Sequence, residues 1–452
     1  MVESFSMSTS VLSPNTRLMP VTAAISAEHH LMIGGCDTVK LAERWGTPLW
    51  VMDYETIKTS AEALKAGLSV YPGARALYAG KAFMCLAICK LVQNLGLGLD
   101  VVSEGELYTA LRAGFPKEDI YLHGNNKSSA ELIMAVENAG VTIIVDGFQE
   151  LEAVIEIASA RGSRARIMVR VTPGVEPDTH EYIKTGQFDS KFGISLDQVI
   201  PFVERVAQSE EHLEFRGIHA HIGSQSLAME PYLKLVDILA ETVAEIKNRL
   251  GREIDFLNLG GGLGIVYTEA DQPIPLFDWS RAMAERVLEE FSRLGLKQPQ
   301  LLVEPGRSVV GTAGVTLYRA GQVKKFESGK RAVALDGGMA DNPRPATYNA
   351  RYTSVIASRM NKIEADSPVD LVGRFCESGD IIIKGAGIPA ETGDLIAVFS
   401  TGAYNYSMSS NYNRTGKPAC VLVKDGKAEL IIERESLDDL VRQDRIPDFL
   451  IS

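Results

Sequence analysis

The chain has 452 residues, of which 45% are hydrophobic and 23% charged, so neither a disordered nor a fibrous protein fits it, and its length predicts two or three domains. The formal net charge of −12 argues against nucleic-acid binding driven by phosphate contacts, because such binding needs a basic surface. A local basic pocket for a small anion stays compatible with that charge. The five cysteines lack metal-ligand spacing, which is typical of a reducing, intracellular compartment.

Residues 1–20 are rich in Ser and Thr and lack the basic and apolar segments of a secretory signal. We therefore expect a flexible arm there, and Glu3 and the scarcity of arginine disfavour a plastid-targeting role. No window approaches the roughly 18 uninterrupted apolar residues that span a bilayer. These observations predict a soluble, cytoplasmic protein whose partners include neither a membrane nor a nucleic acid.

Short apolar runs alternate with amphipathic stretches from about Ala76 onward. The eight runs predicted as strands are 76–79, 99–102, 120–123, 142–145, 166–171, 217–221, 255–259 and 301–304. Apolar residues recur at helical spacing in 82–95, 104–113, 130–139, 149–160, 196–208, 232–250 and 279–294. This alternation predicts a parallel (β/α)8 barrel of the TIM type. A doubly wound open sheet competes, but it would need a phosphate loop after its first strand, and none is there.

After Gly311 the pattern changes to short β-rich runs separated by Gly, Pro, Asp and Asn. These runs are 331–335, 369–372, 381–383, 394–399, 419–423 and 428–433. Their spacing predicts an antiparallel β-sandwich or β-barrel domain. We therefore expect a barrel over residues 54–310 and a C-terminal β domain over 311–452, with the segment 21–53, including Pro48–Met52, packed against the β domain.

The first predicted strand ends in Tyr78-Ala79-Gly80-Lys81. Reactive groups in a parallel barrel lie just past the carboxyl ends of the strands, so the amine of Lys81 is expected at the mouth of the barrel. A lysine in a partly desolvated site has a lowered pKa and can form a Schiff base. Taken alone, the same residue would be interpreted as a surface lysine that opens a helix.

The sixth predicted strand leads into His219-Ala220-His221-Ile222-Gly223-Ser224-Gln225. Strand alternation places His219 and His221 on the same side, and the Gly-Ser pair offers an amide and a hydroxyl to an anion. Two histidines at this spacing could bind a metal, but zinc needs a third ligand of comparable signal, and only His123 is a further histidine at a strand end. We therefore predict no metal site.

The seventh and eighth predicted strands end in Gly260-Gly261-Gly262-Leu263-Gly264 and Glu304-Pro305-Gly306-Arg307. The glycines let the backbone approach an anion, where such barrels commonly bind phosphate, although glycine clusters also serve tight turns. Glu304 beside Arg307 would ordinarily be a structural ion pair. Combined with an amine, a histidine ring and a phosphate loop, Glu304 can instead keep a pyridinium nitrogen protonated. The four features together predict a pocket for pyridoxal 5'-phosphate.

The same residues resemble the barrel-type, fold III pyridoxal-phosphate-dependent decarboxylases, and among them the diaminopimelate decarboxylases. The resemblance runs from about Gly46 to Gly416. Its main motifs are Tyr78-Ala79-Gly80-Lys81-Ala82, His221-Ile222-Gly223-Ser224, Gly260 to Gly264, Glu304-Pro305-Gly306-Arg307, Cys376-Glu377-Ser378-Gly379-Asp380 and Gly402-Ala403-Tyr404. Further motifs are His180-Glu181-Tyr182-Ile183, Thr185-Gly186, Asp189-Ser190-Lys191-Phe192-Gly193, Asp336-Gly337-Gly338-Met339, Arg344-Pro345-Ala346 and Tyr348.

The resemblance implies a role for each cofactor residue. Lys81 would bind the cofactor covalently, His221 would stack on its ring, and Glu304 would pair with its pyridine nitrogen. The phosphate would be bound by Ser224, the amides of Gly261 and Gly262, and the turn Pro305-Gly306-Arg307. Tyr404 would contact both cofactor and substrate.

The resemblance also implies how the substrate is held. Its distal end would be bound by Arg307, Arg344, Tyr348 and Glu377, and Cys376 would return a proton to the α-carbon. A distal carboxylate and ammonium need a cationic fork and an acid, which Arg344 and Glu377 supply. In the family, residues of the Cys376, Glu377 and Tyr348 type complete the site of a neighbouring subunit, which implies a homodimer with shared active sites.

Two stretches depart from the family pattern. Gly373-Arg374-Phe375 stands before Cys376 where Gly-Pro and a small apolar residue are expected, and Val171-Thr172-Pro173 has Thr where Asn is usual. Neither touches a proposed catalytic atom. Cys376 on its own would be interpreted as a buried structural thiol, but its motif favours the catalytic interpretation.

The implied activity is decarboxylation of meso-2,6-diaminopimelate to L-lysine and carbon dioxide, the last step of lysine synthesis. A second hypothesis keeps the cofactor and changes the reaction to decarboxylation of carboxynorspermidine, ornithine or arginine, or to racemisation. Ornithine has no distal carboxylate, so an enzyme for it would have no use for Arg344. A third hypothesis, a non-catalytic pyridoxal-phosphate-binding homologue, is disfavoured because Lys81, Cys376 and the phosphate loop are all present.

Overall fold

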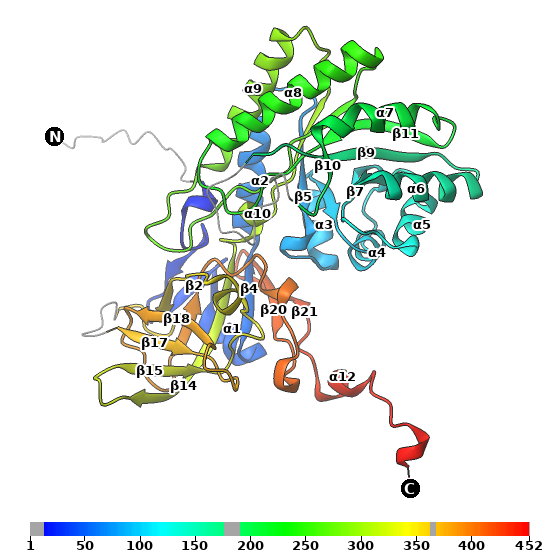
Figure 1. Ribbon diagram of the computed structural model, residues 1–452. Helices are drawn as coiled ribbons and strands as arrows, with labels where there is room; N and C mark the ends of the chain where they lie inside the picture. Colours follow the sequence, from blue (N-terminus) through cyan, green and yellow to red (C-terminus); the bar gives the residue numbers. More distant parts are fainter. Residues whose placement is uncertain (1–12, 176–189, 362–367, 452) are drawn as a thin grey trace, which may run out of the picture.

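The computed structural model describes residues 13–175, 190–361 and 368–451, and Figure 1 shows a parallel barrel in its upper part and a β-rich domain in its lower part. The barrel strands are β5 (Arg75–Ala79), β6 (Gly98–Val101), β7 (Ile120–Leu122), β8 (Thr142–Val145), β9 (Ala165–Thr172), β11 (Leu213–His219), β12 (Phe256–Asn258) and β13 (Gln300–Val303). Each strand pairs in parallel with the next, and β13 pairs with β5, which closes the sheet. The predicted (β/α)8 barrel and its eight strands are confirmed.

Helices surround this sheet: α3 (Leu86–Asn94), α4 (Glu104–Arg112), α5 (Ser129–Glu137), α6 (Phe148–Ala160), α7 (Val199–Ala207), α8 (Glu230–Leu250), α9 (Leu276–Arg293) and the short α10 (Arg307–Val310). An unpredicted helix, α2 (Tyr54–Leu68), precedes the first barrel strand and packs against α9 and α10. The side chain of Asp53 caps α2 by accepting from the Thr56 N–H at 3.0 Å. A further short strand, β10 (Ile194–Ser195), pairs with β9.

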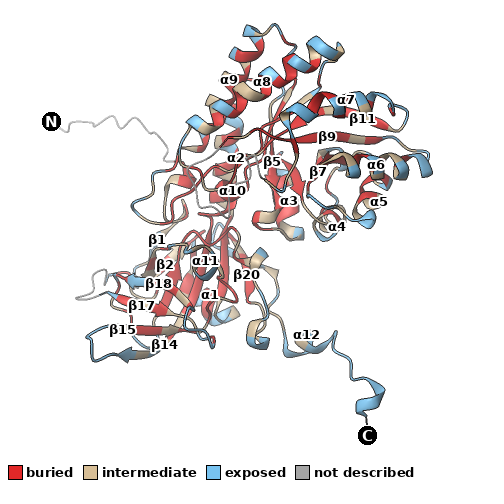
Figure 2. Cartoon of the chain, viewed as in Figure 1, coloured by how far each residue is buried: buried red, intermediate tan, exposed pale blue. Residues whose placement is uncertain are grey.

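Burial follows this architecture. Every residue of β6 and β8 is buried, as expected for strands covered on both faces, and the helices expose only their outer sides (Figure 2). The barrel strands therefore position the residues at their carboxyl ends from a rigid, fully packed sheet. Across the described residues, no helix combines the length and the apolar character needed to cross a membrane.

The β-rich domain contains β4 (Leu49–Asp53), β14 (Gly314–Lys325), β15 (Arg331–Leu335), β16 (Ser354–Ile356), β17 (Val369–Val372), β18 (Ile381–Ala386), β19 (Leu395–Val398), β20 (Ala419–Lys424) and β21 (Lys427–Ile432). The main order is β18-β17-β15-β14-β4-β20-β21, and β19 pairs with β14 and β16. Pairs β15–β17 and β4–β20 are parallel, so the sheet is mixed and not purely antiparallel as predicted. Long connections join the strands of these two pairs, where hairpins would have made them antiparallel.

The chain segment that precedes the barrel packs with the β-rich domain. Strand β4 lies between β14 and β20, pairing with both. The small sheet β1 (Ala24–Ile25), β2 (Leu31–Ile33) and β3 (Cys36–Asp37), followed by α1 (Thr38–Trp45), lies nearby. Leu31 and Ile33 of β2 share an apolar cluster with Leu49 and Val315. The N-terminal segment therefore contributes to the core of the β-rich domain.

The flexible arm predicted over residues 1–20 is wrong for residues 13–20, which are ordered. Residues 1–12 lie outside the described residues, but Asn15 is fully buried. Its side-chain amide donates to the carbonyl of Ile274 at 2.8 Å and its carbonyl accepts from the Val266 N–H at 2.9 Å. These bonds fix the chain from Ser13 onward against the barrel.

Candidate active site

A cavity of about 910 Å³ lies at the carboxyl ends of the barrel strands and reaches α11 (Arg344–Tyr348) and Tyr404 of the β-rich domain. All of the predicted cofactor and substrate residues line it, except Pro305, Cys376 and Glu377. Pro305 is buried between the lining residues Glu304 and Gly306. Residues separated by more than 300 positions thus meet at one place, which is where reactive groups of such barrels are expected.

Lys81 lies in a short 3-10 turn, Gly80–Ala82, directly after β5. Its Nζ is 3.2 Å from Oδ2 of Asp100, a fully buried residue of β6, while 39% of the Lys81 side chain stays exposed. Burial lowers the pKa of Lys81, but the charges of Asp100, Tyr404 and Glu304 outweigh burial and raise it overall. The predicted lowering of this pKa is therefore wrong, because a facing carboxylate stabilises the ammonium.

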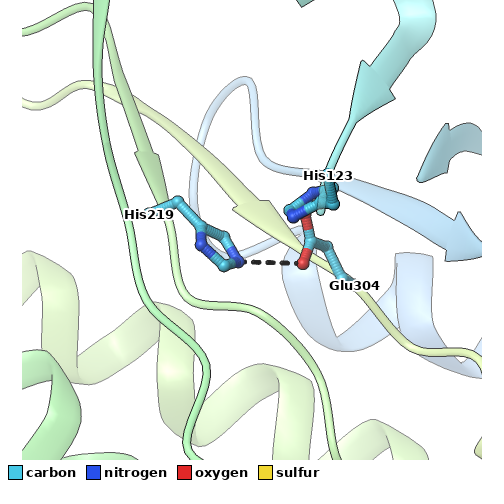
Figure 3. A group of neighbouring side chains, drawn as sticks. All are labelled: His123, His219 and Glu304. Atoms are coloured by element: carbon cyan, nitrogen blue, oxygen red, sulfur yellow. Dashed lines mark hydrogen bonds and ion pairs between the residues drawn. The ribbon is translucent and has the colours of Figure 1, made fainter. Parts of the chain in front are cut away.

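Glu304 forms the floor of the cavity, directly after β13. Figure 3 shows His123 and His219 pointing at its carboxylate. Oε1 accepts from His123 Nε2 at 2.8 Å and from Asn258 Nδ2 at 2.7 Å, and Oε2 accepts from His219 Nε2 at 3.1 Å. Burial alone would raise the pKa of Glu304, but the two histidines outweigh it and hold the pKa well below its ordinary value. The carboxylate is therefore ionised.

The same three residues bring their ligand atoms within 4.8 Å of one another, a spacing that a metal ion could use. Burial lowers the pKa of His219 to about 4, so its ring is neutral at neutral pH. A neutral imidazole that donates its Nε2–H to Glu304 has no lone pair at that nitrogen for a metal. The hydrogen bonding therefore gives His123 and His219 the role of donors to a buried carboxylate.

His221 lines the cavity two residues beyond His219. Burial lowers its pKa well below the ordinary value, and the charges of Lys81 and Arg170 act in the same direction. Its Nδ1 accepts from the Gly261 N–H at 3.2 Å. The ring is therefore a flat, neutral surface on the cavity wall.

The glycine loop after β12 is held by close backbone contacts. A Cβ on Gly261 would lie 1.9 Å from the carbonyl oxygen of Glu304, and one on Gly262 would lie 2.0 Å from that of Gly223. Gly262 also has φ +108°, which other residues rarely adopt. Only glycine fits here, and the cavity wall beside Ser224 is consequently bare backbone.

Arg307 and Arg344 also line the cavity, and each is only 6% exposed. Arg307 donates to Ser224 Oγ at 2.9 Å and to Tyr267 Oη at 2.5 Å, and Arg344 donates to Tyr352 Oη at 2.7 Å. Within the part of the chain that the structure describes, neither guanidinium forms an ion pair with a carboxylate. Two buried cations without an acid partner make this part of the cavity a site for anions.

Cys376 and Glu377 lie apart from this cavity, on the exposed loop between β17 and β18. The Glu377 carboxylate accepts from the Tyr412 hydroxyl, and the Cys376 N–H donates to Asn413 Oδ1 at 3.5 Å. Tyr348, which was expected in a neighbour's pocket, lines the cavity of its own chain because it shares the short helix α11 with Arg344.

Other predicted motifs have simpler outcomes. Thr172, the departure at the end of β9, donates its hydroxyl to the Phe192 carbonyl at 2.5 Å, and Phe192 lines the cavity. The motif residues from His180 to Asp189 lie outside the described residues.

Sequence reasoning missed Asp100 and Tyr267. An isolated acid inside the apolar run of β6 was a usable signal for Asp100, whereas nothing in the sequence marks Tyr267.

Known proteins resemble the chain over nearly its whole length. The family model for the pyridoxal binding domain of pyridoxal-dependent decarboxylase matches residues 56–311. A diaminopimelate decarboxylase from Synechocystis sp. is 44% identical over 97% of this chain and 95% of its own length. The Bacillus subtilis protein of the same name is 45% identical over 92% of this chain and 95% of its own.

Solved structures give the same result. The diaminopimelate decarboxylase of M. jannaschii in co-complex with L-lysine has a TM-score of 0.88 and 35% identity, covering 96% of this chain and 100% of that one. The Helicobacter pylori enzyme complexed with L-lysine has a TM-score of 0.81 and 33% identity, covering 90% and 98%. The chain therefore belongs to the pyridoxal-dependent decarboxylase family, together with the diaminopimelate decarboxylases.

Proposed function

We propose that the chain is a cytoplasmic enzyme that binds pyridoxal 5'-phosphate at Lys81 and decarboxylates meso-2,6-diaminopimelate to L-lysine and carbon dioxide. One observation carries the proposal: a single cavity is lined by an amine, an ionised carboxylate and two buried guanidiniums that have no acid partner among the described residues. The names of the relatives, and L-lysine in two similar structures, support the same substrate.

The residues present fit the cofactor. The ionised Glu304 would accept a hydrogen bond from the protonated pyridine nitrogen of the cofactor. The neutral His221 ring offers a face on which the cofactor ring would stack. Ser224, the backbone of Gly261 and Gly262, and Arg307 would hold the phosphate. When bound, the cofactor supplies an electron sink for the electron pair left when the bond to the α-carboxylate breaks. Glu304 keeps that sink effective because it remains charged.

Arg344 accounts for the choice of substrate. Its buried guanidinium has a raised pKa, because Tyr267 and Tyr352 outweigh the opposing effect of burial, so it stays a cation. A substrate with a distal carboxylate satisfies that cation, and ornithine or a simple diamine leaves it unpaired at a cost. We therefore expect the enzyme to discriminate strongly in favour of diaminopimelate.

Cys376 and Glu377 would act in the active site of a second copy of the chain. Both are exposed and outside the cavity of their own chain, although their motif marks them as functional. In a two-fold dimer, the Cys376 thiol would deliver a proton to the α-carbon after carbon dioxide leaves, and Glu377 would bind the distal ammonium. Each site would then draw on both subunits.

The deciding experiment compares Lys81→Ala with Lys90→Ala, an exposed lysine on α3. With meso-diaminopimelate and the cofactor, wild type and Lys90→Ala are expected to form L-lysine at equal rates, and Lys81→Ala to form almost none while remaining folded. Mass spectrometry after borohydride reduction should locate the cofactor on Lys81. Full activity of Lys81→Ala, or an adduct on a different residue, would refute the proposal.

Substrate choice is tested separately with Arg344→Ala. We expect the kcat/KM for meso-diaminopimelate to fall about a hundredfold, the loss of a charged hydrogen bond and its ion pair. Turnover of ornithine and arginine should stay low in both proteins. If wild type prefers one of these amino acids, the decarboxylase assignment stands but the substrate assignment fails.

A further inference from the structure

Tyr267 lies between the two arginines of the cavity. Its hydroxyl accepts from Arg307 Nη1 at 2.5 Å, and the Arg344 guanidinium lies 4.7 Å from the centre of the Tyr267 ring. The residue is 6% exposed and lines the cavity. One phenol thus contacts two buried cations, Arg307 through its oxygen and Arg344 through its ring.

The position of this phenol is fixed from several sides. The Tyr267 N–H donates to Asp271 Oδ2 at 2.9 Å, and the Tyr267 carbonyl accepts from Thr353 Oγ1 at 3.0 Å. Its ring meets the Tyr352 ring edge to face with centroids 5.4 Å apart. Tyr352 in turn accepts from Arg344 at 2.7 Å. A rigid pair of tyrosines therefore surrounds the Arg344 guanidinium.

Electrostatics explain why an oxygen is needed at this point. Two guanidiniums in a buried pocket repel each other, and no acid among the described residues offsets that repulsion. Burial raises the pKa of Tyr267, but Arg307 and Arg344 outweigh burial and lower it overall, so the oxygen carries partial negative charge toward both cations. An apolar ring alone could not hold both groups side by side.

We propose that Tyr267 is a positioning residue for substrate recognition: its phenol, bonded to Arg307 and packed against Arg344, holds Arg344 beside Arg307, so that Arg344 faces the distal carboxylate while Arg307 serves the cofactor phosphate. The inference rests on the proposed function and deepens it. Tyr267 acts through Arg344 and need not touch the substrate. Its removal should weaken ligands that carry the distal carboxylate and spare ligands that lack it.

The test measures inhibition of meso-diaminopimelate decarboxylation by two ligands, with the holoenzyme at saturating pyridoxal phosphate. L-lysine retains the distal carboxylate, and cadaverine is the same chain without it. In Tyr267→Phe we expect the inhibition constant of L-lysine and the KM of the substrate to rise about tenfold, the usual cost of losing a hydrogen bond to a charged group. The inhibition constant of cadaverine and kcat should stay within about threefold.

Tyr71→Phe is the matched control, because Tyr71 is also a buried tyrosine with one hydroxyl bond, to the Pro299 carbonyl before β13. We expect no change in either inhibition constant. In an Arg344→Ala background, Tyr267→Phe should add nothing further to the L-lysine constant, since the two residues act as one unit.

The outcomes separate cleanly. An unchanged L-lysine constant in Tyr267→Phe, or equal shifts for L-lysine and cadaverine, overturns the positioning role. Should Tyr267→Phe not fold, Tyr267→Leu, which also lacks the acceptor, must still shift the L-lysine constant selectively, and it overturns the proposal if it does not. A wild-type enzyme that forms no L-lysine refutes the proposed function itself, which is a different result.

Discussion

The floor of the cavity and the Cys376 loop, residues 373–380, differ in the burial and hydrogen bonding of their functional groups. Glu304 on the floor is 5% exposed, and three donors satisfy its two oxygens. Cys376 and Glu377 in the loop are exposed and lie outside the cavity. A buried charge is tolerated only with partners in place, and the floor has all of its partners within one chain. The loop lies outside the cavity of its own chain, so the proposed function has it act in the site of a second copy.

The largest expected effect comes from replacing a glutamate by glutamine, which removes one negative charge, on the floor and in the loop. Glu304→Gln should reduce kcat about a thousandfold for any amino-acid substrate, because the floor no longer holds an anion for the cofactor nitrogen. Glu377→Gln should instead raise KM for meso-diaminopimelate and change kcat little. Steady-state kinetics distinguish the two results. A Glu304→Gln enzyme with normal kcat would contradict the different roles given to Glu304 and Glu377.

Mixing two inactive variants sharpens the contrast between regions. Lys81→Ala and Cys376→Ala should each be almost inactive, but equal amounts dissociated and reassembled should regain about a quarter of wild-type activity. Half of the dimers are then mixed, and each mixed dimer has one intact site of two. Lysine formation reports the recovery, and each variant treated alone is the control. No recovery would mean that the loop serves its own chain.

Glycine substitutions extend the comparison to folding. Gly261→Ala places a methyl 1.9 Å from the Glu304 carbonyl, so we expect it to lower the free energy of unfolding by about 3–5 kcal/mol. Gly379→Ala in the loop meets nothing within 4 Å and should leave that free energy unchanged. Chemical denaturation measures both. Equal losses for the two variants would contradict the difference in packing.

The smallest expected effect is a pH dependence of stability. His219 has a pKa of about 4 in the folded chain, against about 6.5 unfolded, so only the unfolded chain binds this proton between those values. Protonation of His219 in the unfolded chain should therefore lower the free energy of unfolding by roughly 3 kcal/mol as the pH drops from 6.5 to 4.

The buried neutral His221 acts in the same direction, because its pKa is also lowered. Glu304 keeps its full contribution to the free energy of unfolding until the pH falls below about 4.3, the pKa of a glutamate in the unfolded chain. Denaturation of His219→Gln should show a shallower fall than wild type, and the exposed His29→Gln is the matched control. A slope unchanged by His219→Gln would remove His219 as the cause.

The barrel could be predicted because its signals are local. Short apolar runs mark strands buried on both faces, and polar residues directly after them, such as Lys81 and Glu304, lie where reactive groups are placed. Strand β14 was missed because its apolar first half continues into a less apolar second half that ends in the exposed Lys324-Lys325. The parallel pairing of β4 with β20 could not be predicted, since it joins segments that no local pattern relates.

The candidate site shows the same limit. Motifs place Arg307 and Arg344 in one pocket, but the phenol between them comes from a loop of no recognisable pattern, and only packing brings Tyr267 and Tyr352 together. The raised pKa of Lys81 likewise depends on Asp100, whose distance from the amine no spacing rule gives. Local pattern predicts which residues take part, and three-dimensional packing sets their charge states.

The neighbouring strands β4 and β14 are separated along the chain by the whole barrel. On the ribosome, β4 emerges first, and the barrel can be completed while the strands that flank β4 have not yet been made. The nascent chain must therefore carry an apolar segment with both edges open until β14 is translated, and with one edge open until β20 follows. A sheet built from the two ends of a polypeptide therefore leaves residues 49–53 open to wrong pairing during synthesis.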